Sequence, residues 1–187
     1  MANIRILAEK KVNVVAGTTG WTEQAEAQAV VEEQGIGCLW SPNFAIGVNL
    51  FWQLAEEAAK RMNQFPQFDV ALHEWHHAGK KDSPSGTGLR AAELVLAQLD
   101  HKDTLVTDRL DRLPEPNELH VSSTRVGSIS GTHQVTFDGP FDTLDIKHTS
   151  RSSAAFASGA VLVGEWLQGK QGWFTMDQFL SDYTPSS

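Results

Sequence analysis

The sequence predicts an α+β protein in which a small parallel sheet is followed by a region with a mixed or antiparallel sheet. Near its start, two short apolar segments, residues 12–16 and 36–40, flank a helical segment. This strand, helix, strand order is typical of a parallel sheet, because parallel neighbours need a long crossover connection. From Leu119 onward, three segments with strand patterns follow one another, with glycine-containing turns between them. That pattern favours antiparallel pairing.

The N-terminal part of the chain supplies the elements of the parallel sheet. Residues 3–11 (NIRILAEKK) have the pattern of the end of an amphipathic helix. Val12–Ala16 is rich in β-branched residues, as is typical of a strand covered on both faces. Thr22–Gln34 is rich in alanine, glutamate and glutamine and predicts a helix that ends at Gly35. Ile36–Trp40 then predicts the second strand.

The middle of the chain alternates between helix and strand patterns. Apolar residues recur at helical spacing from Gly47 to about Asn63, so we expect a helix with one apolar face. Phe68–Glu74 alternates apolar and polar residues and predicts a strand. Apolar residues between Leu89 and Leu99 again recur at helical spacing and predict another helix.

The last third of the chain predicts three strands and two helices. The strands are residues 119–126, 133–138 and 143–149, with turns at 127–131 and 139–140, and we expect this region to be antiparallel. Helices are expected at Ala154–Leu167 and, shorter, near Met176–Leu180. The last three residues, PSS, are expected to fray.

Composition excludes several classes of protein. The 187 residues carry a formal net charge of −8, and lysine and arginine never cluster beyond a pair, so the sequence lacks the basic patch of a nucleic-acid binder. The single cysteine, Cys38, cannot form an internal disulfide, which fits a reducing compartment and a packing role. No apolar run is long enough to span a membrane, and the first residues lack a signal-peptide core. We therefore expect a cytoplasmic protein without a membrane partner.

The segment from His73 to Gly88, HEWHHAGKKDSPSGTG, carries an unusual concentration of reactive side chains. Its histidines His76 and His77 follow a predicted strand, a position where loops often hold site residues on a rigid support. Imidazole can exchange a proton near neutral pH, and a nearby lysine can supply positive charge. The SPSGTG stretch opens a helix, whose N-terminal N–H groups and the hydroxyls of Ser85 and Thr87 could bind a carboxylate or a phosphate.

Each of these features also has an ordinary structural interpretation. Ser85 could be a simple helix cap, and adjacent histidines occur on solvated loops. Their coincidence within sixteen residues favours a functional site over chance. A metal site is not expected, because the histidines do not show the HExxH spacing and the chain offers one thiol.

Several motifs resemble one known family. HHAGKKDSPSGTG resembles the signature E-x-HH-x-x-K-x-D-A-P-S-G-T-A of the 4-hydroxy-tetrahydrodipicolinate reductase (dihydrodipicolinate reductase) family. GTTGW at 17–21, SPNFAIGVN at 41–49 and the C-terminal segments GTHQVTFD, IKHT and FASGAVLVGEWLQGKQGWFTMDQFL agree with the same family in the same order. The resemblance therefore covers nearly the whole chain.

The resemblance implies substrate-side roles for the matching residues. His76 would be the proton donor and His77 a neighbour that contacts the substrate. Lys80 would act on the substrate or on its developing charge. A substrate carboxylate would be held at the start of the following helix by Ser85, Gly86 and Thr87.

The resemblance also implies a cofactor side and an assembly. Thr19 would approach the substrate from the cofactor, which would be NADH or NADPH. The residues that would face its nicotinamide ring are Gly17, Thr19, Ser41, Pro42 and Phe44. The expected regions are a remnant of a parallel dinucleotide-binding (Rossmann) sheet at 1–45, a substrate-binding and oligomerisation domain at 46–172, and a C-terminal return segment at 173–187. The expected assembly is a homotetramer.

The implied function is the reduction of 4-hydroxy-tetrahydrodipicolinate, a small cyclic dicarboxylate, in lysine and diaminopimelate biosynthesis. An alternative is a catalytically silent module of the same family that binds the dicarboxylate or serves assembly. The sequence departs from the family in lacking the G-x-G-x-x-G turn, so the adenosine-binding third is expected to be absent and the NADH or NADPH preference cannot be read. Ser83 and Gly88 replace family alanines, and Arg151 is displaced from the family's arginine position, where Ser153 stands.

Overall fold

The computed structural model describes residues 1–184, so the C-terminal residues 185–187, which the sequence predicts to fray, lie outside the described part. The chain divides into two compact units. The three-stranded unit contains Met1–Asn49 and the residues from Ala154 onward, and the five-stranded unit contains Leu50–Ser153. Within residues 1–184, no helix is both long and apolar enough to cross a membrane.

The three-stranded unit is built on a parallel sheet with the strand order β1-β2-β8. The predicted β-α-β arrangement is confirmed, because β1 pairs in parallel with β2 across the intervening helix α2. The strand β8, which pairs with the other edge of β2, was not predicted, since its sequence GWF lacks the β-branched residues that indicated β1. The elements of this unit are α1 (Ala2–Glu9), β1 (Val14–Ala16), α2 (Gln24–Gln34), β2 (Gly37–Trp40), α5 (Ala154–Trp166), β8 (Gly172–Phe174) and α6 (Met176–Asp182).

Strand β2 is buried on both faces, as expected for the centre of a covered parallel sheet. Cys38 belongs to an apolar cluster that includes residues of α1 and α2. The next residue, Leu39, belongs to a second cluster with Val163 of α5 and Phe179 of α6. Burial raises the pKa of the Cys38 thiol to about 12, so this cysteine is a packing residue, as its sequence context indicated.

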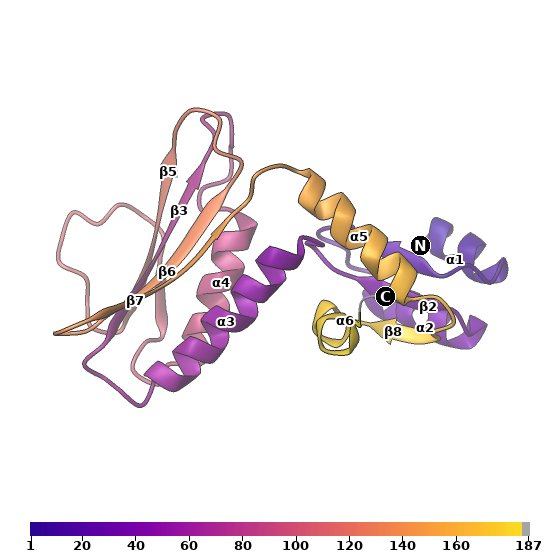
Figure 1. Ribbon diagram of the computed structural model, residues 1–187, viewed down its shortest axis with the longest axis horizontal. Helices are drawn as coiled ribbons and strands as arrows, with labels where there is room; N and C mark the ends of the chain where they lie inside the picture. Colours follow the sequence, from indigo (N-terminus) through magenta and orange to yellow (C-terminus); the bar gives the residue numbers. More distant parts are fainter. Residues whose placement is uncertain (185–187) are drawn as a thin grey trace. The chain divides into compact units, whose positions relative to one another are not determined.

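The five-stranded unit is a mixed sheet with the strand order β4-β5-β3-β6-β7. Helices α3 (Ile46–Met62) and α4 (Gly86–Leu96) lie along one of its faces (Figure 1). The indole N–H of Trp52 in α3 donates to the Thr87 carbonyl in α4 at 3.1 Å. The elements are α3 (Ile46–Met62), whose first turn belongs to the other unit, β3 (Asp69–His76), α4 (Gly86–Leu96), β4 (Thr104–Val106), β5 (Glu118–Arg125), β6 (Thr132–Asp138) and β7 (Thr143–Thr149).

One part of the predicted strand pairing is wrong. The sequence predicts residues 119–149 as one antiparallel region, but β5 and β6 do not pair, because β3 lies between them. Strand β3 runs parallel to β5 and antiparallel to β6, and only the pair β6 and β7 forms the expected hairpin. The segment after β5 crosses the carboxyl end of β3, where the Val126 N–H donates to the His76 carbonyl at 2.9 Å. Alternating residues identify a strand but not its partner.

The central strand β3 separates an inner from an outer face of the sheet. Val70, Leu72, Glu74 and His76 alternate along it and are buried on the face that the helices cover. The intervening His73 and Trp75 lie on the opposite face and remain partly exposed. The inner face is therefore apolar at one end and ionisable at the other.

The two compact units are divided at other residues than the regions expected from the sequence, because residues 46–49 and 154–172 lie in the three-stranded unit. Helix α5, which lies within the expected region 46–172, belongs to the three-stranded unit. It buries Val163 in the cluster around Leu39, to which Leu167, the residue after the helix, also belongs. At Gly159 its backbone comes so close to the loop after β2 that an added Cβ would lie 1.8 Å from the Phe44 carbonyl oxygen.

We predict that Gly159→Ala lowers the free energy of unfolding by about 1–3 kcal/mol, because the methyl group cannot be accommodated against backbone atoms. Urea unfolding followed by circular dichroism would measure this. Gly164→Ala in the same helix is the matched control, since a Cβ there would lie 3.9 Å from Val15 Cγ2, an ordinary contact. The control should be neutral or more stable by about 0.5–1 kcal/mol. Equal effects of the two substitutions would contradict the close packing.

Candidate active site

The inner face of the five-stranded sheet centres on one buried carboxylate. Glu74 of β3 is fully buried. Its Oε1 accepts hydrogen bonds from the Ser85 N–H at 3.0 Å, the Ser123 hydroxyl at 3.1 Å and the Arg125 guanidinium at 2.8 Å. Its Oε2 accepts from the Ser85 N–H, at 3.0 Å, and from the Ser85 hydroxyl. Glu74 thus joins β3 to β5 and to the start of α4.

These contacts keep Glu74 ionised despite its burial. Burial by itself raises the pKa of a carboxyl group. Here the nearby His133 and the hydrogen bonds from Ser85 and Arg125 outweigh burial and hold the pKa of Glu74 well below its usual range. A buried charge of this kind needs a partner of opposite charge, and Arg125 supplies it.

Ser85 caps helix α4 with a hydroxyl that is fully used inside the protein. Its oxygen accepts the Gly88 N–H at 3.1 Å and lies 3.1 Å from His133 Nε2, while its proton goes to Glu74. A serine hydroxyl can donate once and accept twice, so His133 Nε2 must be the donor in this contact. Gly88 is equally constrained, because a Cβ there would lie 2.7 Å from Glu74 Oε2.

The backbone N–H groups of the next two residues, Gly86 and Thr87, take no part in the hydrogen bonds to Glu74. The first N–H groups of a helix have no partner within the helix. Within residues 1–184, we find no acceptor for the N–H of Gly86 or Thr87. Gly86 is exposed, and a Cβ at this position would meet no atom within 4 Å. This turn therefore offers two N–H groups and open space to an anion.

His76 ends β3 beside the same carboxylate. Its side chain is 7% exposed, and its Nδ1 lies 3.5 Å from Glu74 Oε1. Burial lowers the pKa of His76 to about 4, against the opposing charge of Glu74 and with further lowering from His133, Lys80 and Arg125. At neutral pH the ring is therefore uncharged in the unliganded protein.

The remaining residues of the segment lie in the loop between β3 and α4. Lys80 Nζ donates to Asp82 Oδ2 at 2.9 Å, and this hydrogen bond lowers the pKa of Asp82. Arg125 reaches the same loop and donates to the Asp82 carbonyl at 2.6 Å. His77 and Lys81 are exposed. The loop is thus positively charged at Lys80 and anchored to the sheet through Arg125.

The donor atoms of Glu74, His76 and His133 lie within 4.8 Å of one another, a spacing that a divalent cation could use. Glu74, however, already accepts hydrogen bonds on both oxygens, and one donor is the Arg125 guanidinium at 2.8 Å. A cation would have to displace these donors next to a positive charge. We therefore assign no metal to this cluster.

The residues expected on the cofactor side lie in the three-stranded unit, in the loops that follow β1 and β2. The indole N–H of Trp40 donates to the Thr18 carbonyl at 2.9 Å, and the Ser41 N–H donates to the Ala16 carbonyl at 3.1 Å. These bonds bring the two loops together at the carboxyl ends of adjacent parallel strands. Ligands of open α/β sheets bind at this edge.

These loop residues differ in accessibility. Gly17, Thr19 and Pro42 are exposed. Ser41 is buried and donates its hydroxyl proton to the Asn43 carbonyl at 2.7 Å. Phe44 is buried in the cluster around Leu39. Ser41 and Phe44 therefore hold the loop after β2 in shape. Gly17, Thr19 and Pro42 form the exposed surface of the two loops.

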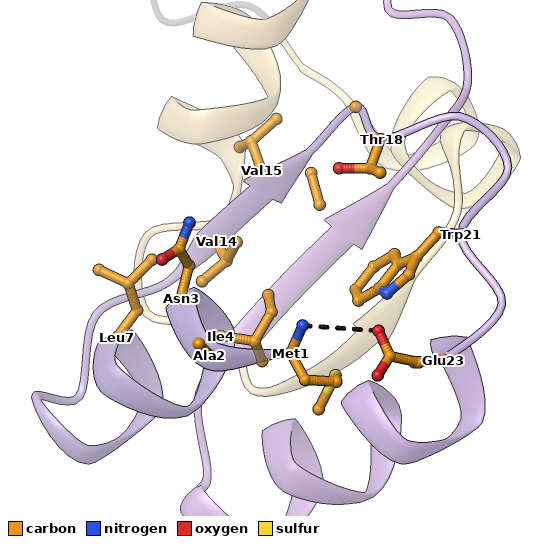
Figure 2. Close-up of a pocket in the computed structure, with 12 residues that line it drawn as sticks. Met1, Ala2, Asn3, Ile4, Leu7, Val14, Val15, Thr18, Trp21 and Glu23 are labelled. Atoms are coloured by element: carbon orange, nitrogen blue, oxygen red, sulfur yellow. Dashed lines mark ion pairs between the residues drawn. The ribbon is translucent and has the colours of Figure 1, made fainter.

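A hollow of about 580 Å³ adjoins the loop after β1 and is shown in Figure 2. Residues of α1 and β1, together with Trp21, line it. At its rim the N-terminal amine of Met1 lies 3.7 Å from Glu23 Oε2. Gly17 and Thr18 also line this hollow, which connects it to the glycine-containing loop.

The sequence-predicted residues thus form two groups, one in each compact unit. Arg151, noted as displaced, is exposed in the five-stranded unit. Sequence reasoning missed Ser123, Arg125 and His133, which complete the surroundings of Glu74. One signal could have found Arg125: a buried glutamate on the inner face of a strand needs a positive partner, and strands β5, β6 and β7 carry two permanently cationic side chains, Arg125 and Lys147.

Comparisons with known proteins match both parts of the chain to one family. The family profile described as "Dihydrodipicolinate reductase, N-terminus" matches residues 1–44, and the profile described as "Dihydrodipicolinate reductase, C-terminus" matches residues 47–180. The 4-hydroxy-tetrahydrodipicolinate reductase of Archaeoglobus fulgidus is 37% identical, with 96% of this chain and 71% of that protein covered. The reductase of the same name from Christiangramia forsetii is 36% identical, with 96% and 74% covered.

A solved structure shares the fold. It is the dipicolinate-bound dihydrodipicolinate reductase from Paenisporosarcina sp. TG-14, with a TM-score of 0.75 and 25% sequence identity. The match covers 93% of this chain and 66% of that one, so the chain spans about two thirds of its length. From the two family profiles and these relatives, we conclude that the chain belongs to the dihydrodipicolinate reductase family of oxidoreductases.

Proposed function

We propose that this chain binds a small cyclic dicarboxylate beside Glu74 and reduces 4-hydroxy-tetrahydrodipicolinate with NADH or NADPH. One observation carries the proposal: His76 and the start of α4 both contact the Glu74 carboxylate. An imidazole that can exchange a proton and a turn that can bind an anion are therefore fixed to one support. We infer the reaction from membership of the family and from relatives that are named 4-hydroxy-tetrahydrodipicolinate reductase.

In this proposal the N–H groups of Gly86 and Thr87 hold one carboxylate of the substrate. Lys80 stabilises the second carboxylate or the charge that develops in the reaction, and His77 borders the site. Ser85 acts indirectly, because its N–H and hydroxyl are both directed to Glu74. The resemblance implied a direct contact for Ser85, and the hydrogen bonds favour a supporting role.

His76 acts as the proton donor. Its pKa of about 4 makes it a poor proton carrier in the unliganded protein at neutral pH. A bound dianion favours the imidazolium form, since an opposite charge raises the pKa of a histidine. Substrate binding would therefore charge His76 when its proton is needed.

In this proposal the cofactor binds at the exposed loops of the three-stranded unit. Gly17, Thr19 and Pro42 would contact the nicotinamide end, and Ser41 and Phe44 would keep the loop in shape. A bound nicotinamide cofactor supplies the hydride. Because these loops lie at the carboxyl ends of parallel strands, they occupy the position where such sheets bind nucleotides.

We also propose the homotetrameric assembly that the resemblance implies. The face of the five-stranded sheet opposite α3 and α4 carries the partly exposed Trp75, with Lys147 Nζ 5.5 Å from its ring centroid. The strand β7 is largely exposed and lies at the edge of the sheet, where a strand of a neighbouring copy can pair with it.

The proposed activity is tested by oxidation of NADH and NADPH in the presence of freshly generated 4-hydroxy-tetrahydrodipicolinate. We expect turnover by the wild-type chain, and His76→Asn should lower kcat by about 10²–10⁴-fold because a positioned acid is lost. Binding of pyridine-2,6-dicarboxylate without turnover would instead favour a silent binding module. If the chain neither binds this ligand nor turns over the substrate, a role in assembly would remain.

Lys80 and Lys81 provide a matched pair for testing dicarboxylate binding. We predict that Lys80→Gln weakens the affinity for pyridine-2,6-dicarboxylate about tenfold or more, because a charge-assisted contact is lost. Lys81→Gln, which removes the same charge from an exposed neighbour, should change the affinity little. Isothermal titration calorimetry measures both. Equal losses would indicate general electrostatic attraction and would exclude a specific contact by Lys80.

The pKa of His76 predicts the pH dependence of binding. If a dianion raises this pKa above about 4, the complex holds more protons than the free protein. Affinity for pyridine-2,6-dicarboxylate should therefore increase as the pH falls from neutral to about 5. Calorimetry in buffers of different ionisation enthalpy should detect proton uptake, and His76→Asn should reduce it. The same uptake in the wild type and the variant would refute the role of His76.

A further inference from the structure

His133 has no role in the reaction proposed above, yet it contacts His76 and Ser85 of the candidate site. It is located on β6, directly opposite Glu74 in the antiparallel register, and its side chain is 5% exposed. Its ring packs edge-on against the His76 ring, with centroids 5.0 Å apart and an interplanar angle of 70°. The ring centroid of Phe51 in α3 lies 6.2 Å away. The position of His133 is therefore determined by contacts on several sides.

The hydrogen bonds of His133 determine which nitrogen carries its proton. Nε2 lies 3.1 Å from the Ser85 hydroxyl oxygen and 3.6 Å from Glu74 Oε2. Since Ser85 gives its proton to Glu74, Nε2 of His133 must donate. Its Nδ1 is buried and, within the described residues, has no partner, so a bare nitrogen is less costly there than an N–H.

The same reasoning extends to His76. Its Nδ1 is buried and faces the Glu74 carboxylate at 3.5 Å, which favours a proton on that nitrogen. The other nitrogen, Nε2, lies beside Gly131, where an added Cβ would come within 3.1 Å. The lack of a side chain at Gly131 leaves space next to Nε2, so this nitrogen is the one that can exchange a proton.

We propose that His133 is a positioning residue for His76. Its N–H fixes Ser85, and thereby the Glu74 carboxylate, while its ring fixes the tilt of the His76 ring. The result is a His76 tautomer with the proton on Nδ1 and with Nε2 available to a substrate. This inference rests on the function proposed above, in which His76 is the proton donor.

A packing role for His133 makes different predictions from a positioning role. A phenylalanine would keep the ring and the apolar contacts but lose the N–H to Ser85. A glutamine can place an amide N–H close to the position of Nε2, although it lacks the ring. His148 offers the matched control, since it lies opposite His133 on β7 and its ring centroid is 6.3 Å from that of Phe51.

The experiment compares His133→Phe, His133→Gln and His148→Phe in the full chain. We expect His133→Phe to lower kcat about ten- to hundredfold with little change in KM, because His76 is misplaced while the anion-binding turn remains. His133→Gln should restore most of the rate, and His148→Phe should resemble the wild type. Thermal unfolding and binding of pyridine-2,6-dicarboxylate establish that each variant is folded.

A second measurement does not depend on turnover. Nitrogen-15 chemical shifts of the His76 ring report its tautomer, and we expect the proton on Nδ1 in the wild type and in His133→Gln. In His133→Phe a mixture of tautomers should appear. Wild-type shifts in His133→Phe would overturn the inference even if the chain reduces its substrate. Conversely, the expected shifts in a chain without turnover would uphold it while the proposed function fails.

Discussion

The five-stranded unit depends on one buried negative charge. Glu74 is inaccessible to solvent, and its burial is tolerated because Arg125 and three other donor groups surround it. Those donors come from β5 and from the first turn of α4, so satisfying the carboxylate fixes the relative positions of these elements. The apolar half of the same sheet face, which includes Val70 and Leu72, follows the ordinary rule of hydrophobic burial. The ionisable half instead depends on the hydrogen bonds and the ion pair that surround Glu74.

This arrangement links binding to chemistry. Ser85 directs its N–H and hydroxyl inward to Glu74, which leaves the N–H groups of Gly86 and Thr87 for an external anion. His76 lies on the other side of the same carboxylate. In the proposed reaction, the group that binds the substrate and the group that protonates it would therefore share one rigid support.

Much of the fold was predictable from local pattern, whereas the pairing of distant strands was not. The β-α-β arrangement of β1, α2 and β2 followed from two apolar runs and a helix that ends at Gly35, which adopts φ 62°. The position of β3 between β5 and β6 could not be predicted, because strand periodicity contains no information about the partner. Likewise, His76 and Ser85 stand in one conspicuous segment, while Arg125 and His133 lie in ordinary strand sequences. Their importance appears only when the sheet brings them to Glu74.

The close approach of Gly88 to Glu74 has an evolutionary consequence. The family signature that this chain resembles has alanine at that position, yet here a Cβ would lie 2.7 Å from the carboxylate oxygen. A homologue with alanine must therefore hold its glutamate slightly farther from the helix. The residue at position 88 therefore sets how closely the first turn of α4 can approach the Glu74 carboxylate.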